Sequence, residues 1–333
     1  MKLQDICISL YSFGFSAGFV SSGVAPNLVN IDTLIGVCQA FGLGGVELPV
    51  DRLFPDCKDS DIERLVDKFR LHGLTVKFDL ESFEPDYLEK LVPILRKVDI
   101  SFVRCKIFNF YGGNRYLYPE FDVQFNAFCE LVSEVVPHLK NFGVQLLVEN
   151  HQDITFREYE KLWERFGPEH IGINWDIGNS LPALETPEDF LRLGKDRIGN
   201  IHLKDYKVFQ CPEGYLMARC ALGEGFVDYE SVFKVLLMQP CAIPMSIELG
   251  ALNGRVAHIN SPDYWRAFGL HQSDQRVQRF VSYIAAITER QTNWKTPWEE
   301  KREPAAILRY EFQEVFRSIK FLKGMFDRVA QSN

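Results

Sequence analysis

The chain has 333 residues, of which 46% are hydrophobic and 25% are charged, a composition typical of a globular protein with one large domain or two smaller ones. Its formal net charge of −8 argues against a nucleic-acid binder, and no apolar run approaches the roughly 20 residues of a membrane helix. The eight cysteines are scattered without a CxxC pair, which is typical of reduced thiols and predicts a cytoplasmic protein.

Short apolar runs alternate with amphipathic stretches along most of the chain. We expect β-strands at residues 6–13, 44–50, 75–80, 102–108, 145–150, 171–176, 199–205 and 244–250. Helix-like segments separate most of them, and several begin near Asn or Asp and close on glycine, as 30–42 does. Eight strand-helix units in sequence predict an α/β fold, a (β/α)8 TIM barrel, over residues 1–255.

Residues 256–333 are too many for the last barrel helix alone. Helical patterns cover residues 273–290 and 304–329, so we expect the last barrel helix together with a C-terminal helical extension. Two interpretations of the extension stay open. The helices pack on the barrel, or they form an interface between two copies of the chain, which would make the protein a homo-oligomer.

Four successive predicted strands end on acidic or imidazole side chains, in a barrel whose chemistry is expected at the C-terminal ends of its strands. These residues are Glu149, Asp176, His202 and Glu248. Each alone could be a salt bridge, a cap or a satisfied core histidine. Three carboxylates and an imidazole on neighbouring strands, however, favour one divalent metal ion, and their oxygen and nitrogen atoms suit Mn²⁺, Mg²⁺, Co²⁺ or Zn²⁺.

The motifs VENH, WDIGN, IHLKD, LGEGFVDY and SIELG together resemble the sugar phosphate isomerase/epimerase superfamily, the xylose isomerase-like TIM barrels, over about residues 6–250. The resemblance implies that Glu149, Asp176, His202 and Glu248 form a single-metal site. It also implies that Glu149 and Glu248 are the catalytic carboxylates, which move a proton on opposite faces of the substrate. The expected activity is that of an isomerase or epimerase of a small keto sugar or sugar acid, through a metal-stabilised enediolate.

These motifs leave the reaction open, because isomerisation, epimerisation and dehydration all begin with loss of the same α-proton. One alternative is a dehydratase of the same barrel family that acts on a cyclitol ketone or a 3-dehydroshikimate-like acid. An alternative of another class is a non-catalytic sugar-binding barrel. Asn179 stands where several epimerases and the endonuclease branch of the family have a histidine, which argues further against action on nucleic acid.

Further polar residues near the strand ends are candidates for contacts with a carbohydrate substrate: His151, Asn179, Lys204, Arg219 and Glu47. On a continuing strand His151 shares a face with Glu149, and Lys204 shares the face of His202. Lys204 and Arg219 would suit an anionic group on the substrate. For Lys204 and Glu47 the structural alternative is an ion pair within the barrel, and for Arg219 it is an exposed position before a turn.

Overall fold

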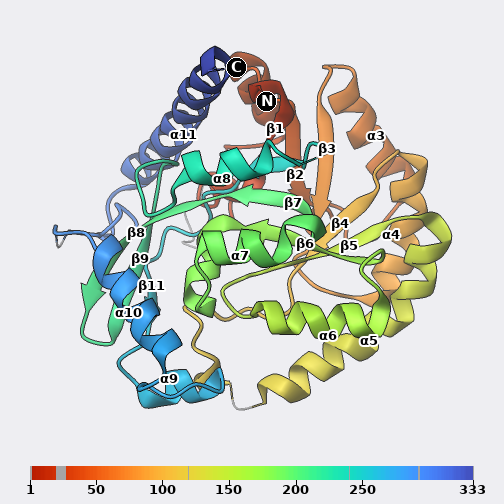
Figure 1. The fold of residues 1–333 in the computed structure, drawn as a ribbon. Coiled ribbons are helices and arrows are strands. Elements are labelled where there is room, and N and C mark those ends of the chain that lie inside the picture. Colours follow the sequence, from red (N-terminus) through yellow and green to blue (C-terminus); the bar gives the residue numbers. More distant parts are fainter. Residues whose placement is uncertain (1, 20–27, 119, 240, 292, 333) are drawn as a thin grey trace.

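In the computed structural model, which describes residues 2–19, 28–118, 120–239, 241–291 and 293–332, eight parallel strands close into a barrel (Figure 1). The strands follow one another around the barrel in chain order, and the last pairs with the first. They are β1 (Ile6–Ser9), β2 (Gly45–Pro49), β3 (Thr75–Asp79), β4 (Phe102–Cys105), β5 (Gln145–Glu149), β6 (Ile171–Asp176), β7 (Ile198–Leu203) and β10 (Met245–Ile247). The predicted (β/α)8 architecture is confirmed.

Helices connect the strands and surround the barrel (Figure 1). They are α1 (Ile31–Phe41), α2 (Val50–Leu53), α3 (Asp59–Arg70), α4 (Pro85–Lys97), α5 (Phe121–Phe142), α6 (Phe156–Phe166), α7 (Pro187–Gly194) and α8 (Tyr229–Leu236). The predicted start and stop signals act as expected on α1. The Asn30 side chain accepts a hydrogen bond from the Thr33 N–H at 3.0 Å, and Gly42 ends the helix with φ 69°.

A second sheet of three strands follows β7, which the sequence did not predict. β8 (Asp205–Cys211) and β9 (Gly214–Cys220) form an antiparallel hairpin, and β11 (Arg255–Ala257) pairs with β9. Both hairpin strands are buried along most of their length, so they lack the alternation that marks a half-exposed strand. The sheet packs against the helices that follow β10 and forms a second hydrophobic core with them.

The loop after β9 wraps around the carboxylate of Asp205, the last residue of the IHLKD motif. This carboxylate accepts hydrogen bonds from the backbone N–H groups of Gly223, Gly225 and Val227 at 3.0–3.2 Å. Gly223 has φ 79°, and a Cβ on Gly225 would lie 2.2 Å from an Asp205 carboxylate oxygen. Both positions therefore require glycine, one for its backbone angle and the other for space.

Three helices follow the barrel strands: α9 (Pro262–Ala267), α10 (Gln275–Ile287) and α11 (Pro304–Ser332). The last of them lies between α8 and α1. Phe321 contacts Tyr229 with ring centroids 5.7 Å apart, and Phe316 contacts Phe41 at 5.0 Å. The final helix thus takes the position of the eighth barrel helix, and β11, α9 and α10 are inserted between it and β10 (Figure 1).

α11 is fixed to the barrel by a buried carboxylate. Glu311 accepts hydrogen bonds from the backbone N–H groups of Phe15 at 2.8 Å and Ser16 at 2.9 Å. Val315, Ile319 and other apolar residues of the same helix belong to the main hydrophobic core. The predicted C-terminal helices are therefore present, and α11 packs on the barrel. An interface with a second copy of the chain stays a prediction.

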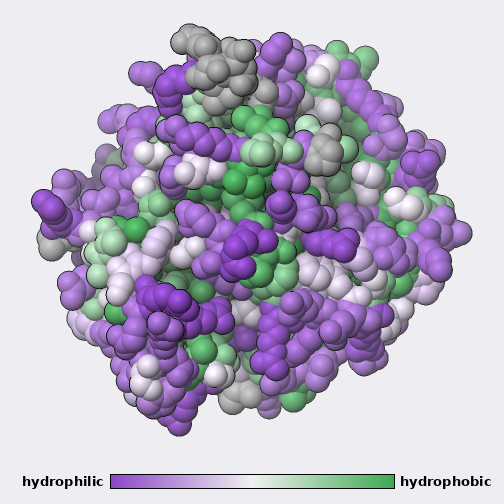
Figure 2. Space-filling model, viewed as in Figure 1, coloured by the Kyte–Doolittle hydropathy of each residue, from purple (hydrophilic) through white to green (hydrophobic). Residues whose placement is uncertain are grey.

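The visible surface is mostly hydrophilic, with smaller hydrophobic groups in its hollows (Figure 2). Within the part of the chain that the structure describes, the helices are too short or too polar to cross a lipid bilayer.

Candidate metal and active site

The four predicted ligands meet at one end of the barrel. They are carried by β5, β6 and β7 and by the residue that follows β10, and these four strands are neighbours. All four side chains are buried, with at most 5% of each residue exposed: Glu149, Asp176, His202 and Glu248. Ligand atoms of the first three lie within 4.8 Å of one another. The fourth joins them through its Oε2, which lies 2.6 Å from the Nδ1 atom of His202.

Several polar atoms of this cluster point at one another without forming hydrogen bonds. Asp176 Oδ1 is buried and has no hydrogen-bond partner among the described residues, and His202 Nδ1 and Glu248 Oε2 face each other as an ion pair without hydrogen-bond geometry. A buried polar atom without a hydrogen-bond partner lowers the stability of the fold by about 1–3 kcal/mol. Such atoms at the ends of the barrel strands are therefore expected where a bound ligand supplies the missing partner. Carboxylate and imidazole donors in this arrangement fit one divalent cation.

Glu47 fixes the orientation of His202. The His202 Nε2–H donates to Glu47 Oε1 at 2.7 Å, which leaves Nδ1 facing Glu149 at 3.4 Å. Burial lowers the pKa of His202, but Glu248 and Glu47 outweigh this effect and raise it well above its ordinary value. Glu47 is fully buried and is not among the described residues that line the nearby cavity. Glu47 thus pairs with His202 inside the barrel, which was the structural alternative to a contact with a sugar.

Arg104 on β4 is a site residue that sequence reasoning missed. Its Nε donates to Glu149 Oε2 at 2.5 Å, and its Nη2 pairs with the same oxygen. Burial raises the pKa of Glu149, yet Arg104 and His202 hold it below its ordinary value, so the carboxylate stays ionised. A signal was available, because an arginine within the apolar run at 102–108 has to find a partner once the strand is buried.

Lys204 connects two of the predicted metal ligands. Its Nζ contacts Asp176 Oδ2 and lies 2.9 Å from Glu248 Oε1. Burial lowers the pKa of Lys204, but the two carboxylates raise it well above its ordinary value, so the side chain is a buried ammonium. The ammonium offsets the repulsion between the two acids. Lys204 also lines the cavity, so the same side chain that forms the ion pairs within the barrel is accessible to a molecule in the cavity.

Asn179, on a 3-10 helix (Ile177–Ala183) directly after β6, orients the carboxylates. Its amide nitrogen donates to Asp176 Oδ2 at 2.6 Å and to Glu149 Oε1 at 3.3 Å. Its amide oxygen accepts hydrogen bonds from Gln152 at 2.9 Å and Tyr206 at 3.3 Å. Neither donor was predicted from the sequence, because both contacts depend on how the loops meet after the barrel closes.

A cavity of about 280 Å³ opens beside the cluster and gives it access to small molecules. Four of the predicted residues are among those that line it: His151, Asn179, Lys204 and Glu248. His151 packs beside Tyr111 with ring centroids 5.1 Å apart, and its Nδ1 has no hydrogen-bond partner among the described residues. Burial lowers the pKa of His151 to about 3, so the ring is neutral at physiological pH.

The placement of Arg219 differs from the prediction. Its guanidinium is buried, donates to Glu314 on α11 at 3.0 Å and to the Gly250 carbonyl at 2.7 Å, and is not among the described residues that line the cavity. These contacts join β9 to the last helix. They depend on a partner 95 residues away in the sequence, which no local pattern around Arg219 indicates.

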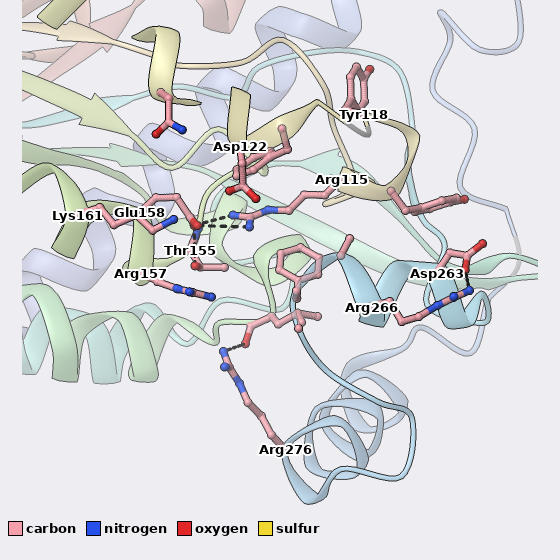
Figure 3. A pocket seen from close by; sticks show the side chains of 17 residues that line it. Arg115, Tyr118, Asp122, Thr155, Arg157, Glu158, Lys161, Asp263, Arg266 and Arg276 are labelled. Atoms are coloured by element: carbon pink, nitrogen blue, oxygen red, sulfur yellow. Dashed lines mark hydrogen bonds and ion pairs between the residues drawn. The ribbon is translucent and has the colours of Figure 1, made fainter. Parts of the chain in front are cut away.

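A larger groove of about 940 Å³ lies on another part of the molecule, beside α5, α6 and α9 (Figure 3). Of its charged side chains, Arg115 pairs with Glu158, and Arg266 pairs with Asp263. The described residues that line this groove include none of the predicted site residues. We therefore place the candidate active site in the smaller cavity, where buried polar atoms converge.

Comparison with known proteins agrees with this fold and this strand-end site. A family model described as a xylose isomerase-like TIM barrel matches residues 35–268. The chain belongs to this family. The resemblance drawn from the sequence motifs is thereby confirmed.

Two relatives and one solved structure show how far the similarity within the xylose isomerase-like family extends. The 3-oxo-isoapionate decarboxylase of Pectobacterium atrosepticum is 24% identical over 69% of this chain and 80% of its own length. The protein YihM of Escherichia coli is 21% identical over 99% of this chain and 94% of its own. The probable 3-DHS dehydratase AsbF of Bacillus anthracis superposes with a TM-score of 0.52 at 14% identity, covering 87% of this chain and 100% of that one. At that identity the structure shows a shared fold alone.

Proposed function

We propose that this xylose isomerase-like barrel is a divalent-metal-dependent isomerase or epimerase of a small keto sugar or sugar acid. One observation carries the proposal. Two carboxylates, Glu149 and Glu248, approach the Nδ1 atom of His202 at 3.4 and 2.6 Å beside a cavity of about 280 Å³. Burial raises the pKa of Glu248, but His202 and Lys204 bring it well below its ordinary value, so both acids are ionised and able to accept a proton.

Four residues would hold the cation: Glu149, Asp176, His202 and Glu248. When bound there, a divalent cation would withdraw electron density from a substrate carbonyl and so acidify the neighbouring carbon. Glu149, held ionised by Arg104, would accept the proton that leaves this carbon, and the electron pair of the broken C–H bond would move toward the carbonyl oxygen.

The direction from which the proton returns distinguishes the two reactions. Glu248 lines the cavity and follows β10, three places around the barrel from the β5 strand of Glu149. Once it has taken up a proton from solvent, it is the candidate to give that proton to the carbon from the other side, while Glu149 releases the abstracted proton to solvent. Return on the opposite face of the same carbon gives an epimer, whereas transfer to the neighbouring carbon on one face gives an isomer. The neutral ring of His151 and the ammonium of Lys204 line the same cavity and would orient hydroxyl groups.

A decarboxylase of a 3-oxo sugar acid is the second candidate. It is favoured by the relative from Pectobacterium atrosepticum, which is named a 3-oxo-isoapionate decarboxylase and matches 69% of this chain. Breaking the bond to a carboxylate leaves its electron pair on the carbon beside the carbonyl, the same place as loss of a proton does. The same cluster would then serve, and Glu149 or Glu248 would pass a proton taken up from solvent to that carbon. Dehydration remains the third variant of this chemistry.

Exchange of substrate protons with D₂O tests the proposal. Metal-loaded protein would be incubated with ketoses and keto sugar acids, and deuterium at the α-carbon would be followed by mass spectrometry and NMR. We expect exchange in the wild type and a loss of at least about a hundredfold in Glu149→Gln and Glu248→Gln. Glu311→Gln is the matched control, because this buried carboxylate of α11 accepts hydrogen bonds from the backbone of Phe15 and Ser16, outside the cluster.

The mass of the product separates the alternatives. Loss of carbon dioxide would favour the decarboxylase and loss of water the dehydratase. Sugar binding without exchange or any change of mass would support the non-catalytic sugar-binding barrel and contradict the enzyme proposal.

A further inference from the structure

We infer that the substrate carries an anionic oxygen group, a carboxylate or a phosphate, and that Lys106 and Arg255 bind it at the cavity. The inference rests on the proposed function, since it names the substrate class of the same site. It concerns two residues that lie outside the cluster of predicted metal ligands and that the sequence analysis did not select.

The charges that line the cavity are unequal in number. Five cationic side chains line it, Arg52, Arg104, Lys106, Lys204 and Arg255, against two carboxylates, Glu81 and Glu248. Arg52 pairs with Glu81 at 3.2 Å, Arg104 pairs with Glu149, and Lys204 pairs with Glu248 at 2.9 Å.

The side chains of Lys106 and Arg255 make no ion pair and donate no hydrogen bond to any residue in the described parts of the chain. Both are partly buried. A cation that is partly removed from water and has no anionic partner is poorly compensated, so a cavity with two of them favours an anionic ligand.

Arg255 is held in position by an aromatic ring rather than by an acid. Its guanidinium carbon lies 3.3 Å from the centroid of the Tyr111 ring, and Tyr111 in turn packs beside His151. Stacking immobilises the guanidinium without using its N–H groups, which remain available to a planar or tetrahedral anion. His151, whose Nδ1 has no hydrogen-bond partner among the described residues, also lines the cavity.

Lys106 lies one residue beyond β4, two residues after Arg104. It lines the cavity together with His151. Arg255 comes from β11, in the segment inserted between the last barrel strand and the last barrel helix. The proposed anion site thus combines a barrel loop with the second sheet, whereas the metal ligands come from the barrel alone.

The cavity limits the size of the anion's carrier. A volume of about 280 Å³ is at the lower end of the range for small-molecule sites. It suits a monosaccharide acid or a small sugar phosphate, with the acidic group near Lys106 and Arg255 and the reacting carbons near Glu149 and Glu248.

Binding of unreactive sugar analogues tests the inference separately from the reaction. D-glucitol, D-gluconate and D-glucitol 6-phosphate are matched in length, lack an aldehyde or ketone, and differ in charge. Titration calorimetry on Mn²⁺-loaded protein should show at least one of the two anions binding tenfold or more tightly than glucitol. Lys106→Met and Arg255→Met should each lower the affinity for that anion by about tenfold to a hundredfold, because a hydrogen bond to a charged group contributes about that much to binding. The affinity for glucitol should stay unchanged.

Controls separate local binding from net charge and from folding. Lys161→Met removes one positive charge in the groove of Figure 3 and should leave anion binding unchanged. Arg255→Lys should restore only part of the affinity, since an ammonium does not keep the stacked, forked geometry. The unfolding midpoint of Lys106→Met should match the wild type, because the Lys106 side chain takes part in no ion pair among the described residues. Arg255→Met should lose only the stacking on Tyr111 and remain folded at the assay temperature.

The outcomes are distinct. Preference for gluconate identifies a sugar acid and preference for glucitol 6-phosphate a sugar phosphate; either supports the inference. It is overturned if glucitol binds as tightly as both anions, if none of the three binds, or if Lys106→Met and Arg255→Met leave anion binding unchanged. Anion preference without deuterium exchange would contradict the proposed reaction alone, whereas exchange of neutral ketoses without anion preference would contradict this inference alone.

Discussion

Replacement of Glu47 by glutamine tests whether the cluster around His202 binds a metal. Glu47 lies outside the proposed ligand set but accepts the Nε2–H of His202 at 2.7 Å, and its other oxygen accepts a hydrogen bond from Ser246 at 2.5 Å and from Asn200 at 3.3 Å. In Glu47→Gln one amide end can still accept from His202. The amide nitrogen then faces the donors of Asn200 and Ser246, and the negative charge behind the imidazole is lost.

Both effects weaken His202 as a ligand. Loss of the carboxylate partner behind a metal-binding histidine typically costs about tenfold to a hundredfold in metal affinity. We expect that loss for Mn²⁺ or Zn²⁺, measured by competition with a chromogenic chelator at fixed pH. Glu311→Gln is the matched control, because Glu311 is equally buried and accepts backbone hydrogen bonds elsewhere. It should lower stability without changing metal affinity. A folded Glu47→Gln protein with wild-type metal affinity would refute this reasoning.

Three further variants test the contacts around the site and the fold. Arg104→Met should lower the free energy of unfolding by about 3–5 kcal/mol in chelator-treated protein, since it leaves buried carboxylates unpaired; a change below about 1 kcal/mol in urea denaturation would contradict this. Gly225→Ala should cost about 1–3 kcal/mol, because its Cβ would lie 2.2 Å from Asp205, and an unchanged melting temperature would refute the crowding argument. Glu158→Gln should cost about 3 kcal/mol at pH 7, since it leaves the buried Arg115 unpaired. Burial raises the pKa of Glu158, but Arg115 holds it below the ordinary 4.5, so the ion pair stabilises the fold above pH 4.5 and is lost as the pH falls further. The free energies of unfolding of the variant and the wild type should therefore converge in acid. A difference that stays constant with pH would contradict the ion pair.

The parts of the fold that local pattern determines could be predicted. The strand-end position of Asp176 and Glu149 follows from apolar runs that stop at a carboxylate, and the caps at Asn30 and Gly42 follow from residue type. Because parallel strands of a barrel present the same ends at one face, placing the strands also placed the four candidate ligands.

Contacts between distant segments could not be predicted in the same way. Arg104 reaches Glu149 only after β4 and β5 pair, and Arg219 turns toward Glu314 because α11 returns to the barrel from the end of the chain. The β8–β9 hairpin was missed because its strands are buried on both faces, so burial there depends on α9 and α10 rather than on alternation within the strands. Arg255 was missed because it belongs to a strand of only three residues, whose pairing with β9 joins segments far apart in the sequence.

Metal content tests the central claim most directly. The protein would be purified without added metal, and elemental analysis would be run beside Asp176→Asn and Glu248→Gln, with Glu311→Gln as the control. We predict near-stoichiometric Mn, Co, Mg or Zn in the wild type and the control, and its loss in the two site variants. No metal in the wild type, none regained on adding Mn²⁺, and unchanged stability in the site variants would make these strand-end acids structural and would contradict the proposed metal-dependent reaction.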